Sequence, residues 1–156
     1  MAMKPPTISR RTMLGATLAA TMPHPAHGQN GRDPARQKPT DVRIRLSFDG
    51  RTMTATLYDN PTARDLATLL PLDLTIEDYG NNEKISYLPR KLTEDGSGPF
   101  GNERPGDLCY FKPWGNLAMF YADYPWDGLI RLGRFDGSFE PLRVRGKFPL
   151  HIERIP

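Results

Sequence analysis

The sequence has few residues that bind metals or act as nucleophiles. Its 156 residues include one cysteine, Cys109, and three histidines, of which only His151 lies beyond residue 28. A single cysteine cannot form an internal disulfide, and one Cys with one His cannot close a Cys/His zinc site. The chain also has no Gly-x-Ser-x-Gly nucleophile elbow, no phosphate-binding glycine-rich loop and no dinucleotide fingerprint. We therefore expect no metal and no cofactor.

The few reactive side chains have ordinary structural interpretations. Cys109 lies in the strand-like run Asp-Leu-Cys-Tyr-Phe, where a free cysteine usually acts as a small buried hydrophobic residue. His151 alternates with apolar neighbours and is predicted on the outer surface of a strand. Glu77, Asp78 and Glu83 lie near a turn, but Glu77 and Asp78 are adjacent in a strand-like run and point to opposite sides. For these carboxylates we predict a solvated turn rather than a calcium or acid–base site.

Acidic residues are absent from the first 28 positions. Lys4, Arg10 and Arg11 account for the whole formal charge of +3, and the other 18 basic residues balance the 18 acidic ones. The rest of the chain therefore has no general attraction for nucleic acid or anionic lipid. We expect nucleic acid not to be a partner.

Residues 1–28 have the pattern of an export signal. Arg10-Arg11 follows a serine, resembles the twin-arginine (Tat) motif and precedes a short, weakly apolar run, Met13–Met22. A membrane anchor is the alternative, but a spanning helix needs about 20 apolar residues, roughly twice the length of this run. The pattern predicts cleavage near Gly28 and a periplasmic or secreted protein that has no membrane attachment after cleavage.

A linker and one domain are predicted after the signal. Residues 29–41 are polar, contain Gly and Pro and lack periodicity, which indicates a flexible linker. Ordered structure is expected to begin at Val42. The ~115 residues of 42–156 can bury roughly two-thirds of their unfolded surface, which is enough for a single core.

The domain is predicted to open with a β-hairpin. Val42–Phe48 alternates between apolar and polar residues, and Met53–Leu57 alternates again after an Asp-Gly pair at 49–50. A two-residue hairpin turn needs positive φ at both central positions, which Asp-Gly tolerates. We therefore predict two paired strands here.

The next segment has the signals of a short helix. Asn60 is a suitable N-cap, Pro61 suits the first helical position, and apolar residues at 63, 66, 67 and 70 follow helical spacing. Pro71 is predicted to end this helix.

Short strand-like runs make up most of the remaining chain. They are Leu72–Glu77, a run around Ile85 and Tyr87, Leu108–Phe111, Leu117–Tyr121, Leu129–Phe135 and Phe148–Ile155. With the hairpin they make about eight short strands, separated by frequent turns. This arrangement predicts a mainly β fold, a closed or nearly closed β-barrel.

Aromatic residues are concentrated in Tyr110–Trp126, which holds seven of the fifteen Phe, Trp and Tyr residues. Within it, both faces of Leu117–Tyr121 are apolar. We therefore expect one face of this strand to meet the barrel interior and the other to meet a helix or loop.

The turn inside this segment is the first candidate site. Pro113 cannot donate to a strand ladder and Gly115 can adopt positive φ, so this segment is predicted to bulge and to place Trp114 at a rim. With Tyr124 and Trp126, Trp114 is expected to line a groove for an apolar or proline-containing ligand. Packing of these rings over the barrel end is the alternative.

Four stretches resemble the bacterial cyclophilin-like fold proteins, whose activity is largely unassigned. They are "LYDNPTARDLATLLPL", "EDYGNNEKISYLPRKL", "GDLCYFKPWGNLAMFY" and "GLIRLGRFDG", and they cover most of Leu57 to Gly137. The resemblance implies a compact β-barrel of about eight strands with one or two short helices that close its ends.

The chain is less similar to the true cyclophilins, whose catalytic segment reads Phe-His-Arg. The nearest match, Leu88-Pro89-Arg90, keeps only the arginine. The stretch Leu117–Phe120 lacks the glutamine of the cyclophilin Gln-Phe-Phe run. If the protein is an isomerase, this resemblance implies a catalytic role for Arg90 alone.

The sequence as a whole favours an exported, cyclophilin-like domain that binds a small apolar or peptide ligand without clear catalysis. A weak or specialised peptidyl-prolyl isomerase is the alternative. An enzyme of another class would need a polar cluster such as Asn116, Tyr87 and Asp107, and a structural role in a larger assembly also stays open. The expected binding residues are Tyr87, Arg90, Trp114, Asn116, Phe120, Tyr124 and Trp126.

Overall fold

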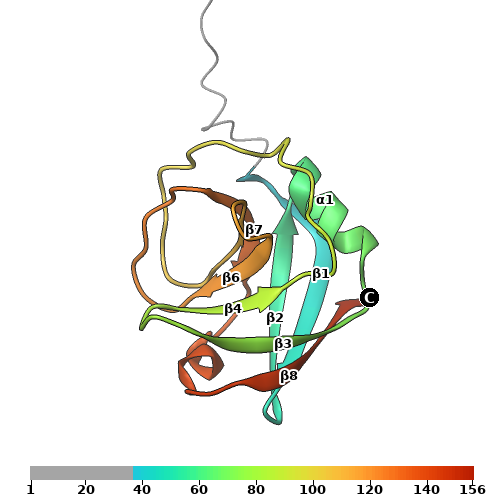
Figure 1. The fold of residues 1–156 in the computed structure, drawn as a ribbon. Coiled ribbons are helices and arrows are strands. Elements are labelled where there is room, and N and C mark those ends of the chain that lie inside the picture. The colour runs from blue at the N-terminus through green and yellow to red at the C-terminus, as the bar shows by residue number, and fades with distance from the viewer. Residues whose placement is uncertain (1–36) are drawn as a thin grey trace, which may run out of the picture.

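The computed structural model describes residues 37–156, so the predicted export signal lies outside the described residues. Eight antiparallel strands close into a barrel in the order β1-β2-β7-β5-β6-β4-β3-β8 (Figure 1). The elements are β1 (Pro39–Phe48), β2 (Arg51–Tyr58), α1 (Pro61–Thr68), β3 (Leu72–Tyr79), β4 (Glu83–Tyr87), β5 (Asp107–Phe111), β6 (Asn116–Phe120), β7 (Leu129–Phe135), the 3₁₀ helix η2 (Glu140–Arg143) and β8 (Phe148–Ile155). The predicted mainly β barrel is confirmed.

The first strand begins three residues before the predicted start of order. β1 starts at Pro39, which pairs with Tyr58 at the end of β2, whereas the sequence pattern pointed to Val42. Thr40 explains the difference, because its hydroxyl donates a hydrogen bond of 2.8 Å to the carbonyl of Leu57. This contact holds the end of the predicted linker against β2.

The hairpin and the helix follow their sequence signals. Asp49 and Gly50 both have positive φ, 49° and 66°, as a two-residue turn between right-twisted strands requires. At the start of α1, the side-chain oxygen of Asn60 accepts a hydrogen bond of 2.8 Å from the amide of Ala63, which satisfies one free donor of the first turn. Pro61 occupies the first turn of the helix.

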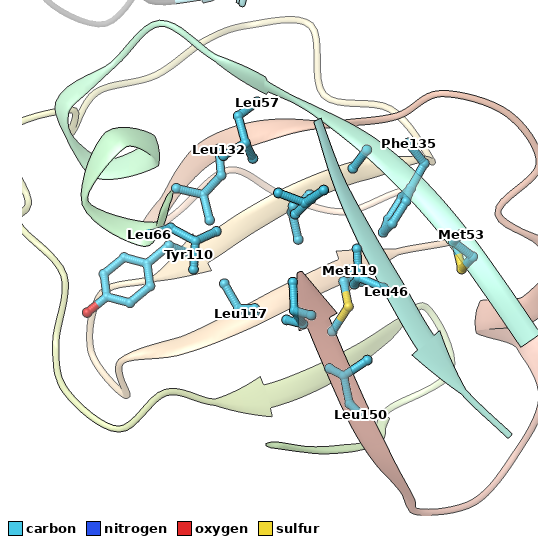
Figure 2. Packing of buried hydrophobic residues seen from close by; sticks show 14 of the residues in the cluster. Leu46, Met53, Leu57, Leu66, Tyr110, Leu117, Met119, Leu132, Phe135 and Leu150 are labelled. Carbon is cyan, nitrogen blue, oxygen red and sulfur yellow. The ribbon is translucent and has the colours of Figure 1, made fainter. Parts of the chain in front are cut away.

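Apolar side chains from all around the barrel fill its interior. Figure 2 shows ten labelled members of this core: Leu46, Met53, Leu57, Leu66, Tyr110, Leu117, Met119, Leu132, Phe135 and Leu150. Leu66 comes from α1 and meets Leu57 and Leu132 at one end of the barrel. The helix therefore closes that end with an apolar side chain.

Strand β6 lies between two separate apolar clusters. Leu117 and Met119 belong to the barrel interior, whereas Ala118 and Phe120 belong to a second cluster on the outer face. That second cluster also contains Phe100, Cys109, Tyr124 and Leu129. The prediction that both faces of this strand are covered is confirmed, and the outer cover comes from loops.

A buried carboxylate joins those loops to the sheet. Asp107 is fully buried and accepts hydrogen bonds from the hydroxyl of Tyr124 at 2.6 Å and from Nη1 of Arg134 at 2.9 Å. It also accepts from the amide of Arg104 at 3.0 Å, and Arg131 lies 3.6 Å away. Asp107 therefore has full hydrogen bonding in an apolar surrounding, where an unpaired charge would be costly.

The acidic pair at the end of β3 does not lie in a solvated turn, contrary to the prediction. The carboxylate of Asp78 is 2.8 Å from Nζ of Lys84, whose side chain is fully buried. It also accepts a hydrogen bond of 2.6 Å from the amide of Gly146. Glu77 lies 3.4 Å from Lys147 instead. Asp78 thus neutralises a buried lysine, which the sequence does not reveal because it requires the β3–β4 register.

Candidate ligand pocket on the outer face of the barrel

Three neighbouring strands, β4, β6 and β5, build the floor of the candidate site. Asn116, Ala118 and Phe120 point outward from β6, because they alternate with the core residues of that strand. The register places Glu83 of β4 opposite Phe120 and Phe111 of β5 opposite Asn116. Side chains from three consecutive strands, which the sheet orders as β5-β6-β4, therefore meet on one surface.

A cavity of about 220 Å³ lies over this floor. Its walls come from the β3–β4 turn, the β5–β6 turn and the loop before β7. The lining residues are Tyr79, Asn82, Glu83, Ile85, Phe111, Trp114, Asn116, Phe120, Pro125, Asp127 and Leu129. Aromatic and aliphatic side chains thus make up most of the lining, as is typical of small-molecule pockets.

Trp114 forms an aromatic wall of this pocket. Its ring packs edge to face against Tyr79, with centroids 5.4 Å apart, and against Phe111 at 5.3 Å. Such T-shaped pairs are favoured arrangements of aromatic rings. Trp114 is still 48% exposed, so it lies at the rim, as predicted.

The backbone at the next residue explains how Trp114 reaches this place. Gly115 has φ of 68°, a left-handed conformation that side chains with a Cβ resist, and its amide donates to the carbonyl of Phe111 at 2.9 Å. The segment is a tight turn that joins β5 to β6 rather than a bulge within one strand.

Tyr124 supports the pocket from below rather than lining it. Its ring stacks on Phe120, with centroids 3.7 Å apart and an interplanar angle of 11°. Its hydroxyl donates to Asp107 and lies 3.6 Å from the thiol of Cys109. Burial raises the pKa of both Tyr124 and Cys109. Cys109 is therefore a buried thiol and not a nucleophile at neutral pH.

Two polar side chains in the lining have unusual surroundings. Asn116 is 1% exposed, and its Nδ2 donates to the carbonyl of Leu117 at 3.0 Å. Within residues 37–156, the Oδ1 of Asn116 has no hydrogen-bond partner. Desolvation raises the pKa of Glu83 to about 7. A buried free acceptor and a shifted carboxyl in one cleft indicate a functional site.

The structure brings together only part of the predicted binding set. Trp114, Asn116 and Phe120 line the pocket. Tyr87 lies opposite Asn116 across β4 and β6, but it is exposed and outside the lining. Trp126 is also exposed and outside the lining.

Arg90 is engaged away from the pocket. Its guanidinium donates to the carboxylate of Asp65 in α1 at 2.7 and 3.0 Å and to the carbonyl of Lys91 at 3.1 Å. The same carboxylate accepts from the amide of Thr93 at 2.9 Å. The hydrogen bonds from Arg90 hold the pKa of Asp65 below its ordinary value. Arg90 thus fastens the segment after β4 to the helix.

The polar cluster that another class of enzyme would need does not form. Asp107 is fully buried against Tyr124 and Arg134, whereas Asn116 opens on the pocket and Tyr87 on solvent. His151 lies on the surface, 2.7 Å from Asp73, as its alternation predicted.

Two further features are absent from the described part of the chain. Within residues 37–156, no three His, Cys, Asp or Glu side chains gather closely enough to hold a metal ion. Over the same range, no helix is long and apolar enough to cross a membrane.

The sequence missed most of the lining. Tyr79 and Glu83 flank the β3–β4 turn, and Asp127 comes from the loop before β7, more than 40 residues later in the chain. Only the pairing of β4 with β6, strands separated by the whole of β5, places Glu83 beside Phe120. Phe111 was part of the aromatic stretch, and its period-two relation to Cys109 was the one signal that pointed to the outer face.

Residues 46–153 match the model of the Cyclophilin-like family. The solution structure of a hypothetical protein from Archaeoglobus fulgidus has a TM-score of 0.62 and 20% sequence identity, over 76% of this chain and 98% of that one. At this identity the likeness shows the fold alone. No curated protein matches the sequence. Since the family match spans well over half of the chain, the protein belongs to the Cyclophilin-like family.

Proposed function

We propose that this protein is an exported binding module that takes a small apolar or peptide ligand into the outer-face pocket and does not transform it. The chief support is the wall formed by Trp114, which is half exposed yet packed against Tyr79 and Phe111. Aromatic side chains that are already packed at a rim offer a large contact area and lose little conformational entropy when a ligand binds.

The size of the pocket limits what it takes. Ligand pockets for drug-sized molecules have volumes of about 300–1,000 Å³, whereas this cavity has about 220 Å³. It therefore suits one ring or one short apolar side chain of a larger ligand. Phe120 and Leu129 offer apolar contacts at its floor and side.

The position of Arg90 is the main argument against isomerase activity. An arginine that assists prolyl isomerisation has to reach the imide nitrogen of a proline bound in the pocket. Arg90 instead pairs with Asp65 and is not among the lining residues. The proposal therefore places binding, and not catalysis, at this site.

Export is part of the proposal and rests on residues 1–28 alone. The twin arginines at positions 10 and 11 and the short apolar run after them support it. A pocket that opens on the surface would then meet ligands of the periplasm or the medium.

Chemical-shift mapping tests the site directly. The full-length ¹⁵N-labelled protein is titrated with 2-phenylethanol and with N-acetylproline methylamide, each a single-ring probe. We expect the largest shifts at the indole of Trp114 and the side-chain amide of Asn116. Shifts confined to the helix face around Ala63 and Arg64, where a second hollow lies, would show that ligands bind elsewhere.

A further inference from the structure

The charges around the outer-face pocket have one sign. Glu83 from β4 and Asp127 from the loop before β7 line it, and no lysine or arginine does. This contrasts with the balance of charge over residues 29–156, which hold 18 basic and 18 acidic residues. Among the lining residues, a ligand therefore meets negative charge and no positive charge.

Neither of these carboxylates is already paired. Three buried or half-buried acidic side chains elsewhere have partners, since Asp107 has Arg134, Asp78 has Lys84 and Asp65 has Arg90. Neither Glu83 nor Asp127 makes an ion pair or side-chain hydrogen bond within residues 37–156. Glu83 is half-buried, and a partly buried charge that lacks a partner is costly to keep, which points to a partner supplied from outside. Asp127 is exposed and adds negative charge at the edge of the pocket.

Each amide side chain of the pocket uses one of its two N–H donors within the protein. Nδ2 of Asn116 donates to the carbonyl of Leu117, and Nδ2 of Asn82 donates to the carbonyl of Asp123 at 3.3 Å. The buried Oδ1 of Asn116 is an acceptor that has no partner among residues 37–156. Together with the two carboxylates, the pocket mainly offers acceptors, and a ligand that satisfies them must bring donors.

The aromatic wall favours the same kind of ligand. The faces of tryptophan, tyrosine and phenylalanine rings carry negative electrostatic potential and attract organic cations. Trp114, Tyr79 and Phe111 are held edge to face, so their rings present differently oriented surfaces around one rim. Tryptophan is the strongest of these rings for cations.

We propose that the pocket selects ligands that carry an ammonium or guanidinium group on a small apolar or aromatic body. The apolar body lies over Phe120, and the cation lies beside Trp114 within reach of the Glu83 carboxylate. This inference rests on the proposed function, since it names the chemical class that the same pocket binds.

Three probes of similar size and different charge test the inference on the full-length protein. They are 2-phenylethylammonium, 2-phenylethanol and phenylacetate. The binding of each probe at pH 8 is measured by tryptophan fluorescence and by isothermal titration calorimetry. We expect the cation to bind about tenfold more tightly than the alcohol, and the anion to bind more weakly than both. Equal binding of cation and alcohol overturns the inference and leaves the proposed function standing, provided that Trp114→Ala weakens both.

Two variants that each remove one negative charge distinguish the effect of the pocket carboxylate on cation binding from the effect of the protein's overall charge. Glu83→Gln removes a lining carboxylate and keeps its shape, whereas Asp123→Asn removes an exposed carboxylate outside the lining. We expect Glu83→Gln to weaken 2-phenylethylammonium about tenfold without changing 2-phenylethanol, and Asp123→Asn to change neither.

Asp127→Asn provides a second measurement if Glu83→Gln folds poorly by circular dichroism. A loss of cation binding in Asp123→Asn as large as in the lining variants overturns the inference, because it shows only a general charge effect. Failure of all three probes to bind, or binding that Trp114→Ala leaves unchanged, overturns the proposed function as well.

Discussion

Arg90 and Asp65 form a two-point ion pair, with Nη2–Oδ1 and Nη1–Oδ2 distances of 2.7 and 3.0 Å. The pair joins the segment after β4 to helix α1, and the amide of Thr93 completes it. In this geometry the guanidinium donors that a bound proline would require are already directed to a carboxylate. Arg90, the residue that matches the cyclophilin catalytic segment, therefore links the segment after β4 to helix α1.

Removal of this guanidinium should leave the pocket intact. We expect Arg90→Ala to lower the thermal midpoint slightly, because the pair is partly exposed, and to leave ligand affinity unchanged within about twofold. A proline-peptide exchange assay should show no acceleration by the wild-type protein. Clear acceleration that is lost in Arg90→Ala would restore the isomerase alternative.

Gly133 should not tolerate a side chain of any size. A Cβ there would lie 2.2 Å from the carbonyl oxygen of Thr56 and 3.0 Å from the Cα of Leu57, both backbone atoms of the paired strand β2. We predict that Gly133→Ala lowers the free energy of unfolding by about 3 kcal/mol or more. Gly137→Ala is the control, since its Cβ would meet open space. Equal denaturant midpoints for the two variants would contradict the β2–β7 register.

Glu83 should make stability depend on pH. Desolvation raises its pKa from 4.5 to about 7, so between these values the folded protein holds a proton that the unfolded chain releases. The stability that this retained proton contributes is fully present below pH 4.5 and is lost as the pH rises through 7. Because one pKa unit corresponds to about 1.4 kcal/mol and the carboxyl is partly exposed, we expect wild type to lose about 1–2 kcal/mol relative to Glu83→Gln between pH 5 and 8.

Denaturant unfolding of both proteins at several pH values measures this difference. Tyr79 and Asp127 also line the pocket, and Cys109 and Tyr124 lie beneath it, but all four are common to both proteins. His151, whose pKa is raised by Asp73, is shared as well and cancels. Parallel stability curves would show that the Glu83 carboxyl is well solvated.

Export should depend on the twin arginines. With Arg10→Lys and Arg11→Lys together, we expect uncleaved precursor to accumulate in the cytoplasm, because the apolar run is too weak to direct export by hydrophobicity alone. Lys4→Gln is the matched control, since it removes a charge outside the motif. Fractionation and immunoblotting distinguish the outcomes, and normal processing of the double variant would show that the twin-arginine motif is not used.

Local patterns predicted the parts of the fold that neighbouring residues determine. Strict alternation identified β1 and β2, and the cap of Asn60 was evident because its partner, Ala63, lies only three residues away. The positive φ of Gly115 followed from the residue type. These features depend on short-range sterics and hydrogen bonds, which the sequence displays directly.

The pocket was only half predictable, because its walls depend on distant pairing. Trp114 and Phe120 are aromatic residues near a turn, whereas the sequence places Glu83 in a solvated acidic turn, and only the pairing of β4 with β6 puts it beside Phe120. Arg90 is a predicted binding residue because Leu88-Pro89-Arg90 resembles the cyclophilin Phe-His-Arg segment, and its partner Asp65, 25 residues earlier, cannot be identified from spacing. Tyr124 and Trp126 were assigned from composition alone, which does not distinguish a buried support from an exposed ring.

Trp114 provides the most direct test of the central claim, because Trp126 is a matched control. Both indoles are exposed, at 48% and 37%, but only Trp114 lines the pocket. Both variants are titrated calorimetrically with 2-phenylethanol and 2-phenylethylammonium. We expect Trp114→Ala to lose about 1–3 kcal/mol of binding free energy. Denaturant unfolding of this variant should show little change in unfolding free energy. Trp126→Ala should bind as wild type does. Equal affinities for the two variants, or a larger loss in Trp126→Ala, would contradict the assignment of the outer-face pocket as the ligand site.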